Sequence, residues 1–148
     1  MEIAKGKWQQ VEIAEQIARM AHDGQKEEST GADYIHHLER VVALVETEGE
    51  YVKAVAWLHD VLEDTAMTER HLRDAGMSGR IIRAVKTLTR SRGESYKSYI
   101  DRVVEQDAGL EVVVKVADLR DHLRPNCPEG LRPRYEKALA LLTARLFK

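Results

Sequence analysis

The chain has 148 residues, of which 43% are hydrophobic and 32% charged, and its formal net charge is −2. That length suits one domain with a buried core, and the composition is typical of a folded globular protein. The 23 basic and 25 acidic side chains are mixed along the chain, so the sequence lacks the concentrated basic face of a nucleic-acid-binding protein. We therefore expect a single domain over residues 1–148 and no nucleic-acid partner.

Neither the cysteine content nor the hydropathy pattern indicates secretion or membrane insertion. The one cysteine, Cys127, cannot form an internal disulfide, which is typical of an intracellular protein. No apolar run approaches the roughly 20 residues of a membrane span, and residues 1–5 lack the apolar core of a secretory signal. We expect a cytoplasmic protein with no membrane partner, while the sequence leaves the oligomeric state open.

Apolar residues recur at helical spacing along most of the chain, which predicts an all-α fold. Thr68 and Ser78 are plausible N-caps of two short helices, and the polar segment 25–33 is expected to be a loop. In chain order, the predicted helices cover about 7–22, 38–45 with His37 in the first turn, 51–62, 68–76, 78–88, 94–106, 110–118 and 133–146.

The segment from Leu110 to Asp118 is ambiguous, because its run of valines favours a β-strand by propensity alone. We nevertheless expect a helix. No second strand candidate exists to pair with this segment, and an isolated strand would leave its backbone groups without hydrogen-bond partners.

The pair His59-Asp60 interrupts an apolar segment, 54–62, in a helix expected to be buried on most sides. Burying an unpaired imidazole or carboxylate is costly, so these charges require a metal ion or a network of ion pairs. A lone His-Asp dipeptide more often belongs to an ion pair. The order His37, then His59-Asp60, then Asp118, with helical stretches between them, is more specific and predicts one metal site.

Two imidazoles and two carboxylates form a mixed nitrogen and oxygen ligand set. Such a set suits Mn, Fe, Zn or Mg, with water in the remaining positions, better than a closed structural zinc site. Glu63 and Asp64 follow the His-Asp pair by four residues each, one helical turn along the same face. A metal ion lowers the pKa of a bound water, and a nearby carboxylate can orient that water or take its proton, as hydrolysis of a phosphoester requires.

These motifs resemble the HD superfamily of metal-dependent phosphohydrolases. Segments 21–25 (Ala-His-Asp-Gly-Gln), 34–37 (Tyr-Ile-His-His), 58–65 (Leu-His-Asp-Val-Leu-Glu-Asp-Thr) and 116–118 (Val-Ala-Asp) are similar, in the same order, to motifs of the RelA/SpoT-type (p)ppGpp hydrolase domain and its small stand-alone forms. The resemblance implies an all-α HD-domain bundle, a Mn ion and removal of the 3′-pyrophosphate from guanosine tetra- or pentaphosphate.

Carried over position by position, the resemblance assigns a role to each motif residue and leaves His36 outside the ligand set. The implied metal ligands are His37, His59, Asp60 and Asp118, and the implied catalytic residues, which handle the nucleophilic water, are Glu63 and Asp64.

The chain departs from the family where a substrate would bind. Lys26 is followed by Glu27 and Glu28, where the family tends to carry basic residues, and residues 119–124 match the family segment only at Arg124. These differences leave room for a different nucleotide. Candidate substrate-binding residues are cations near the motifs, for which a solvated surface charge is the alternative, and tyrosines, for which core packing is the alternative. They are Lys26, Arg92, Tyr99, Arg120, Arg124 and Tyr135.

The leading hypothesis is metal-dependent hydrolysis of a small phosphorylated nucleotide, with (p)ppGpp the first substrate to test. A 5′-nucleotidase or another nucleotide phosphohydrolase of the superfamily is the second hypothesis. A catalytically silent HD module that binds a nucleotide or a partner protein is the third. The sequence Glu63-Asp64-Thr65 resembles the (p)ppGpp group and favours the first over the second, and the complete ligand set disfavours the third.

Overall fold

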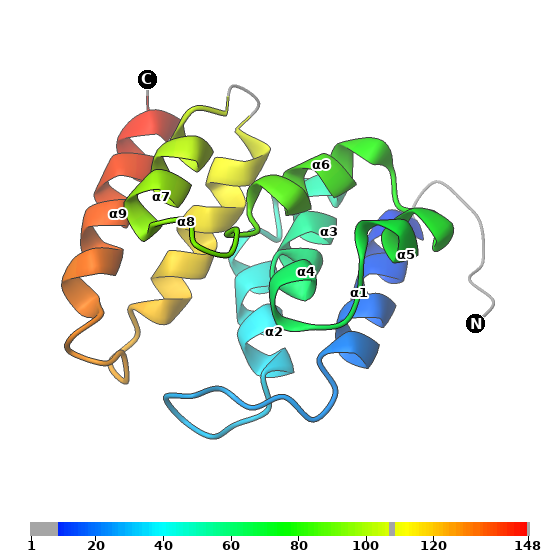
Figure 1. The fold of residues 1–148 in the computed structure, drawn as a ribbon, viewed down its shortest axis with the longest axis horizontal. Coiled ribbons are helices and arrows are strands. Elements are labelled where there is room, and N and C mark those ends of the chain that lie inside the picture. Colours follow the sequence, from blue (N-terminus) through cyan, green and yellow to red (C-terminus); the bar gives the residue numbers. More distant parts are fainter. Residues whose placement is uncertain (1–8, 107–108, 148) are drawn as a thin grey trace.

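The computed structural model describes residues 9–106 and 109–147. In these ranges the chain is helical, with no strand beyond an isolated bridge between Lys26 and Asp33, so the predicted all-α class is confirmed (Figure 1). The helices are α1 (Gln9–Ala21), α2 (Ile35–Leu44), α3 (Glu50–Leu58), α4 (Val61–Asp64), α5 (Glu69–Asp74), α6 (Gly79–Thr87), α7 (Tyr96–Val104), α8 (Leu110–His122) and α9 (Arg132–Leu146). None of them is long and apolar enough to cross a membrane.

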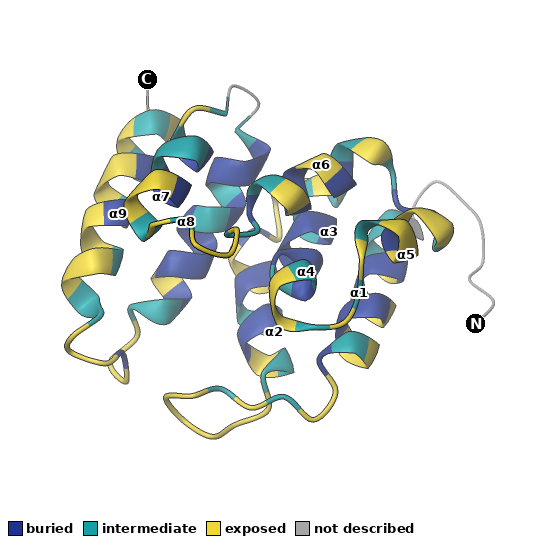
Figure 2. Ribbon diagram, in the orientation of Figure 1, coloured by how far each residue is buried: buried dark blue, intermediate teal, exposed yellow. Residues whose placement is uncertain are grey.

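Helix α3 occupies the middle of the bundle. It packs against α1, α2, α6 and α8, and its residues 54–58 are all buried, as the apolar sequence of this segment predicts (Figure 2). The helices α7 and α9 pack on the far side of α8, while α6 packs against α3, α8 and α5 (Figure 1). Residues far apart in the sequence, on α2, α3 and α8, therefore meet in the interior.

The valine-rich segment forms helix α8, as expected. Most of its residues are buried, because α2 and α3 pack on one side of the helix and α9 on another. Tertiary burial of these β-branched side chains outweighs their strand propensity.

The helix predicted over 51–62 is wrong in one respect, because it is interrupted at the His59-Asp60 pair. Helix α3 ends at Leu58, α4 begins at Val61, and Asp60 has φ −105° and ψ 0°. Adjacent side chains on a continuous helix diverge by about 100°, whereas here His59 Nε2 and Asp60 Oδ2 approach to 3.1 Å. Asp64 still lies one helical turn after Asp60, as predicted, because the Asp64 amide donates to the Asp60 carbonyl at 2.9 Å.

The other predicted boundaries agree with the structure to within a few residues. Both predicted N-caps are confirmed: the Thr68 side chain accepts from the His71 amide and the Ser78 side chain from the Ile81 amide. The segment 25–33 is a loop between α1 and α2. The predicted start of the first helix, at residues 7 and 8, lies outside the described residues.

Candidate metal centre and adjacent pocket

Four side chains from three parts of the bundle converge in its interior. His37 lies on α2, Asp118 on α8, and His59-Asp60 at the break between α3 and α4. Each offers one potential ligand atom, and these four atoms lie within 4.8 Å of one another. His37, His59 and Asp118 are buried, while Asp60 is half-buried. The chain thus contains a His/Asp cluster that could bind a metal ion, formed by the residues singled out in the sequence.

Both histidines direct Nε2 into this cluster, because Nδ1 is engaged elsewhere. His37 Nδ1 lies 2.6 Å from Asp121 Oδ2. His59 Nδ1 lies 2.7 Å from the carbonyl oxygen of Ala56. An acceptor at Nδ1 holds the proton there and leaves the Nε2 lone pair free, as in metal-bound histidines. His37 Nε2 is buried and makes no well-oriented hydrogen bond within the described residues, although Asp118 Oδ1 lies 3.0 Å away.

The carboxylates face these nitrogens at short range. Asp118 Oδ1 lies 3.2 Å from His59 Nε2, and Asp60 Oδ2 lies 3.7 Å from His37 Nε2. Burial alone would lower the pKa of His37, but the neighbouring carboxylates of Asp118 and Asp121 raise it to about 9. Positive charge is therefore favoured at this point, and a divalent cation can supply it once the imidazole proton is released. The donor set fits a metal ion.

Two further side chains fix the orientation of the carboxylates. Lys115 Nζ donates to Asp118 Oδ2 at 2.8 Å, which leaves Oδ1 facing the cluster. Burial alone would lower the pKa of Lys115, but Asp118 raises it well above its usual value, so the buried lysine stays charged. The Tyr34 hydroxyl donates to Asp60 Oδ2.

The residues that support the cluster were not predicted from the sequence. Asp121 is buried and accepts from His37 Nδ1, and Arg40 donates to Asp121 from Nε at 2.6 Å. The available signal was spacing: Lys115 and Asp121 each lie three residues from Asp118 on α8, and Arg40 lies three residues after His37 on α2. Side chains at that spacing share a helix face.

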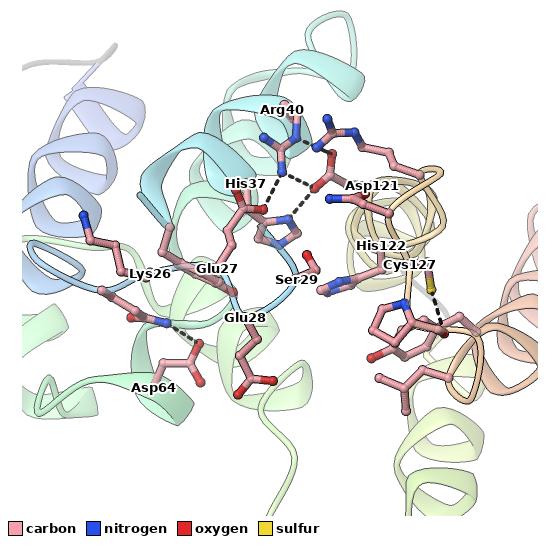
Figure 3. A pocket seen from close by; sticks show the side chains of 17 residues that line it. Lys26, Glu27, Glu28, Ser29, His37, Arg40, Asp64, Asp121, His122 and Cys127 are labelled. Carbon is pink, nitrogen blue, oxygen red and sulfur yellow. Dashed lines mark hydrogen bonds and ion pairs between the residues drawn. The ribbon is translucent and has the colours of Figure 1, made fainter. Parts of the chain in front are cut away.

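A pocket of about 540 Å³ lies beside the cluster. Figure 3 shows it between the 25–34 segment on one side and the end of α8 with its following loop on the other. The charged side chains of its wall are Lys26, Arg40, Arg124, Glu27, Glu28, Asp64 and Asp121, and the other side chains that matter below are His37, His122 and Tyr135.

Two cations of the pocket wall, Lys26 and Arg40, are already engaged by carboxylates. The Lys26 ammonium pairs with Asp33. The Arg40 guanidinium pairs with both Asp121 and Glu27. The nearest carboxylate oxygen recorded for Arg124 is 4.0 Å away, on Asp121. A phosphorylated ligand would therefore compete with side chains of the pocket itself.

The two predicted catalytic carboxylates lie on α4, at the rim of this site. Asp64 lines the pocket, and its Oδ2 accepts from Gln25 Nε2 at 3.4 Å. Glu63 is not among the lining residues, and its Oε1 accepts from the Arg90 amide at 2.9 Å. Burial raises the pKa of both carboxyl groups, with a further contribution from the nearby Asp60 carboxylate.

His122 and Tyr135 form a stacked pair in the pocket wall. Their ring centroids lie 5.3 Å apart at an interplanar angle of 29°, and His122 Nε2 lies 3.2 Å from Asp118 Oδ1. Tyr135 is a predicted substrate-binding residue, whereas His122 was not singled out, although it lies four residues after Asp118 on α8. The pair offers an aromatic surface that reaches from the metal cluster to the pocket wall.

The structure brings some of the predicted substrate-binding residues to the pocket and leaves others away from it. Lys26, Arg124 and Tyr135 line it. Arg92 and Arg120 are exposed and do not line it. Tyr99 corresponds to the core-packing alternative, because it is 4% exposed, its hydroxyl donates to the Leu88 carbonyl at 2.7 Å, and it does not line the pocket.

Two other histidines also have defined positions. His36 is exposed and pairs with Glu39. His22, at the end of α1, is buried, with 2% of its surface exposed. Its Nδ1 lies 2.7 Å from Gln25 Oε1, and its ring packs 5.1 Å from that of Tyr34, so the 25–34 segment covers it.

The chain is similar to known proteins in both sequence and structure, although no protein-family model matches it. It is 32% identical over 142 residues to a guanosine-3′,5′-bis(diphosphate) 3′-pyrophosphohydrolase of Haemophilus influenzae. The match covers 88% of this chain but 20% of that protein, so the chain spans about a fifth of the length of this curated relative.

A similar solved structure is that of a metazoan ortholog of SpoT, which hydrolyses ppGpp and plays a role in starvation responses. The TM-score is 0.77 at 19% sequence identity, and the superposition covers 97% of this chain and 88% of the other. The two proteins share the all-helical fold.

Proposed function

With the fold of an HD-type hydrolase domain as the premise, we propose that this chain is a metal-dependent hydrolase of a phosphorylated nucleotide and that (p)ppGpp is its substrate. The reaction would add water across the 3′-pyrophosphate ester and release GDP or GTP and pyrophosphate. The main support for this proposal is that two histidine nitrogens and two carboxylate oxygens lie within 4.8 Å of one another, beside a pocket of about 540 Å³. We further propose that residues 1–148 act as one such domain.

His37, His59, Asp60 and Asp118 would hold the ion. The mixed nitrogen and oxygen donors suit Mn, Fe, Zn or Mg, and the resemblance to the RelA/SpoT-type hydrolase domain leads us to propose Mn²⁺. When bound, such an ion lowers the pKa of a coordinated water and offsets negative charge on the phosphoryl oxygens. Hydrogen bonds within the chain orient the two histidines for this role. Asp121 keeps the proton on Nδ1 of His37 and the Ala56 carbonyl keeps it on Nδ1 of His59, so both Nε2 lone pairs are available.

Proton transfer from the attacking water is proposed for the acidic pair on α4. Asp64 lines the pocket, and its raised pKa makes it a better proton acceptor than an ordinary aspartate. Gln25 orients the Asp64 carboxylate through its hydrogen bond to Oδ2. Glu63, held by the Arg90 amide, is proposed to position the water from the other side.

Substrate contacts are proposed for Lys26, Arg124 and Tyr135, which line the pocket. Their chemistry supports this role, because ammonium and guanidinium groups bind phosphate and an aromatic ring can stack on a base. The aromatic surface of Tyr135 is extended by its stack with His122.

The charge of the pocket wall favours a second candidate function, that of a nucleotide phosphohydrolase acting on a less highly charged substrate. The pocket wall carries the carboxylates of Glu27 and Glu28 on one side, and the cations Lys26 and Arg40 are paired with carboxylates. A pocket with these charges disfavours a polyphosphate relative to a nucleotide with fewer phosphates.

A nucleotide panel separates these candidates. The Mn-loaded protein is incubated with ppGpp and with nucleoside mono-, di- and triphosphates, and the products are identified by mass spectrometry. Release of GDP and pyrophosphate from ppGpp supports the proposal, whereas phosphate release from another nucleotide supports the second candidate. If nothing is hydrolysed, the result favours the silent binding module. The Asp60→Ala variant, expected to lose both metal and activity, is the negative control.

A further inference from the structure

Arg40 lies where the metal cluster meets the pocket, and one edge of its guanidinium is fully used. Nε donates to Asp121 Oδ1 at 2.6 Å and Nη2 donates to Asp121 Oδ2 at 3.0 Å. This is the two-point geometry that arginine makes with a carboxylate. Because Asp121 also accepts from His37, Arg40 is anchored next to a candidate metal ligand (Figure 3).

The second edge of the same guanidinium is only half used. Nη2 also donates to Glu27 Oε1 at 2.7 Å. Nη1 makes no hydrogen bond within residues 9–106 and 109–147. An arginine edge presents two parallel N–H groups that match two oxygens of a phosphate or carboxylate, and here one carboxylate oxygen occupies it.

The two carboxylates that hold Arg40 differ in how firmly they are fixed. Asp121 lies on α8 with its side chain 4% exposed and bound to His37. Glu27 lies in the loop between α1 and α2, where residues 28–33 are all exposed; its own side chain is 11% exposed, and its other oxygen, Oε2, accepts a hydrogen bond from the Thr30 hydroxyl at 3.4 Å. Glu27 is therefore the carboxylate that can be exchanged without disturbing the metal cluster.

We propose that Arg40 is a phosphoryl-binding residue of this pocket and that Glu27 is a built-in competitor for it. A phosphoryl group would displace the Glu27 carboxylate and accept from both Nη1 and Nη2, while Asp121 keeps the guanidinium in place. The loop carries Glu27 and Glu28 where the family tends to carry basic residues. Arg40 thereby supplies the positive charge beside the cluster that these two residues cannot. That this phosphoryl group belongs to a nucleotide substrate rests on the proposed function. The exchange of Glu27 for a phosphoryl group at Arg40 is independent of it.

The chain offers a matched pair of variants to test this exchange. Glu27→Gln and Glu28→Gln each remove one negative charge from the pocket wall, but only Glu27 contacts Arg40, and Glu28 makes no hydrogen bond or ion pair within the described part of the chain. Binding of inorganic phosphate to the Mn-loaded 148-residue chain is measured by calorimetry. We expect Glu27→Gln to bind phosphate about tenfold more tightly than Glu28→Gln, because it weakens the competing charge-assisted hydrogen bond.

The same comparison is then made in an Arg40→Gln background, where the advantage of Glu27→Gln over Glu28→Gln should disappear. Equal phosphate affinities of the two glutamine variants in the presence of Arg40 would overturn the proposal, and so would an advantage that persists without Arg40. If Arg40→Gln fails to fold, as judged by circular dichroism, the first comparison decides. Since no nucleotide is turned over, failure to hydrolyse ppGpp leaves this test intact.

Discussion

His37 Nδ1 lies 2.6 Å from Asp121 Oδ2, and this contact joins the candidate metal cluster to the pocket beside it. Burial alone would raise the pKa of Asp121, but hydrogen bonds from His37 and Arg40 lower it to about 2. Asp121 is thus an ionised acceptor at neutral pH, which keeps the proton on Nδ1 of His37 and its Nε2 directed at the cluster.

Replacing Asp121 with asparagine should therefore weaken metal binding. Carboxylates that orient a ligand histidine typically contribute about 10–100-fold in metal affinity or activity, and we expect an effect of that size. Mn²⁺ affinity is measured by competition with a chromogenic chelator. Asp101→Asn is the control, because the Asp101 side chain on α7 is 47% exposed and pairs with Lys97. An Asp121→Asn variant with unchanged affinity would show that the histidine needs no carboxylate partner.

Neutralising the acidic pair on α4 should separate metal binding from turnover. Asp64→Asn and Glu63→Gln are expected to retain Mn²⁺ but to lower kcat by about a hundredfold or more, because the proton acceptor for water is removed. Steady-state kinetics and the same chelator competition give the two quantities. Asp74→Asn, an exposed change on α5, should alter neither. Unimpaired kcat in both variants would exclude the roles proposed for Asp64 and Glu63.

Lys115 is expected to stabilise the metal-free protein. Lys115→Met leaves Asp118 buried without its ammonium partner and close to a second carboxylate, Asp60, and breaking a buried pair in this way costs about 3–5 kcal/mol. Urea unfolding of the chelator-treated protein measures the loss. Lys97→Met is the control, since the ion pair of that exposed lysine is screened by solvent and its loss should change the unfolding free energy far less. Equal unfolding free energies for the two variants would contradict this account of Lys115.

The ion pair between Glu94 and Arg102 predicts a pH dependence of stability. Hydrogen bonds from Arg102 and the Ser91 amide lower the pKa of Glu94 to about 2, below its ordinary value of 4.5. A depressed carboxyl pKa contributes stability above the unfolded-state value, and that contribution is lost as the pH falls towards 2. Wild type should therefore melt above Glu94→Gln at neutral pH, with a difference that shrinks below about pH 4.5. A difference independent of pH would contradict this.

The helical fold could be predicted because a helix buried on one face in a bundle carries apolar residues at helical spacing in its sequence. Apolar spacing located most helices, and the valine-rich segment from Leu110 to Asp118 was placed correctly because nothing could pair with it as a strand. The break at His59-Asp60 could not be predicted from periodicity, since the apolar pattern continues through it. That break depends on dihedral angles that let two adjacent side chains face the same point.

The candidate site was only partly predictable for a related reason. The sequence singled out residues whose chemistry is unusual in an apolar run, so the four residues of the cluster stood out. Arg40 and Asp121 look like ordinary surface charges in the sequence, and their role follows from the packing of α2 against α8. Conversely, Arg92 and Arg120 were chosen for proximity to motifs, but proximity along the chain does not fix the direction of a side chain.

The most direct test of the central claim is the metal stoichiometry of the wild-type chain and of Asp118→Asn. Both are loaded with Mn²⁺, dialysed and measured by inductively coupled plasma mass spectrometry, with circular dichroism to verify folding. If His37, His59, Asp60 and Asp118 hold one ion, the wild-type chain retains one Mn²⁺ per molecule and Asp118→Asn retains far less. A wild-type chain that retains no ion, or a variant that retains as much as wild type, would contradict the account.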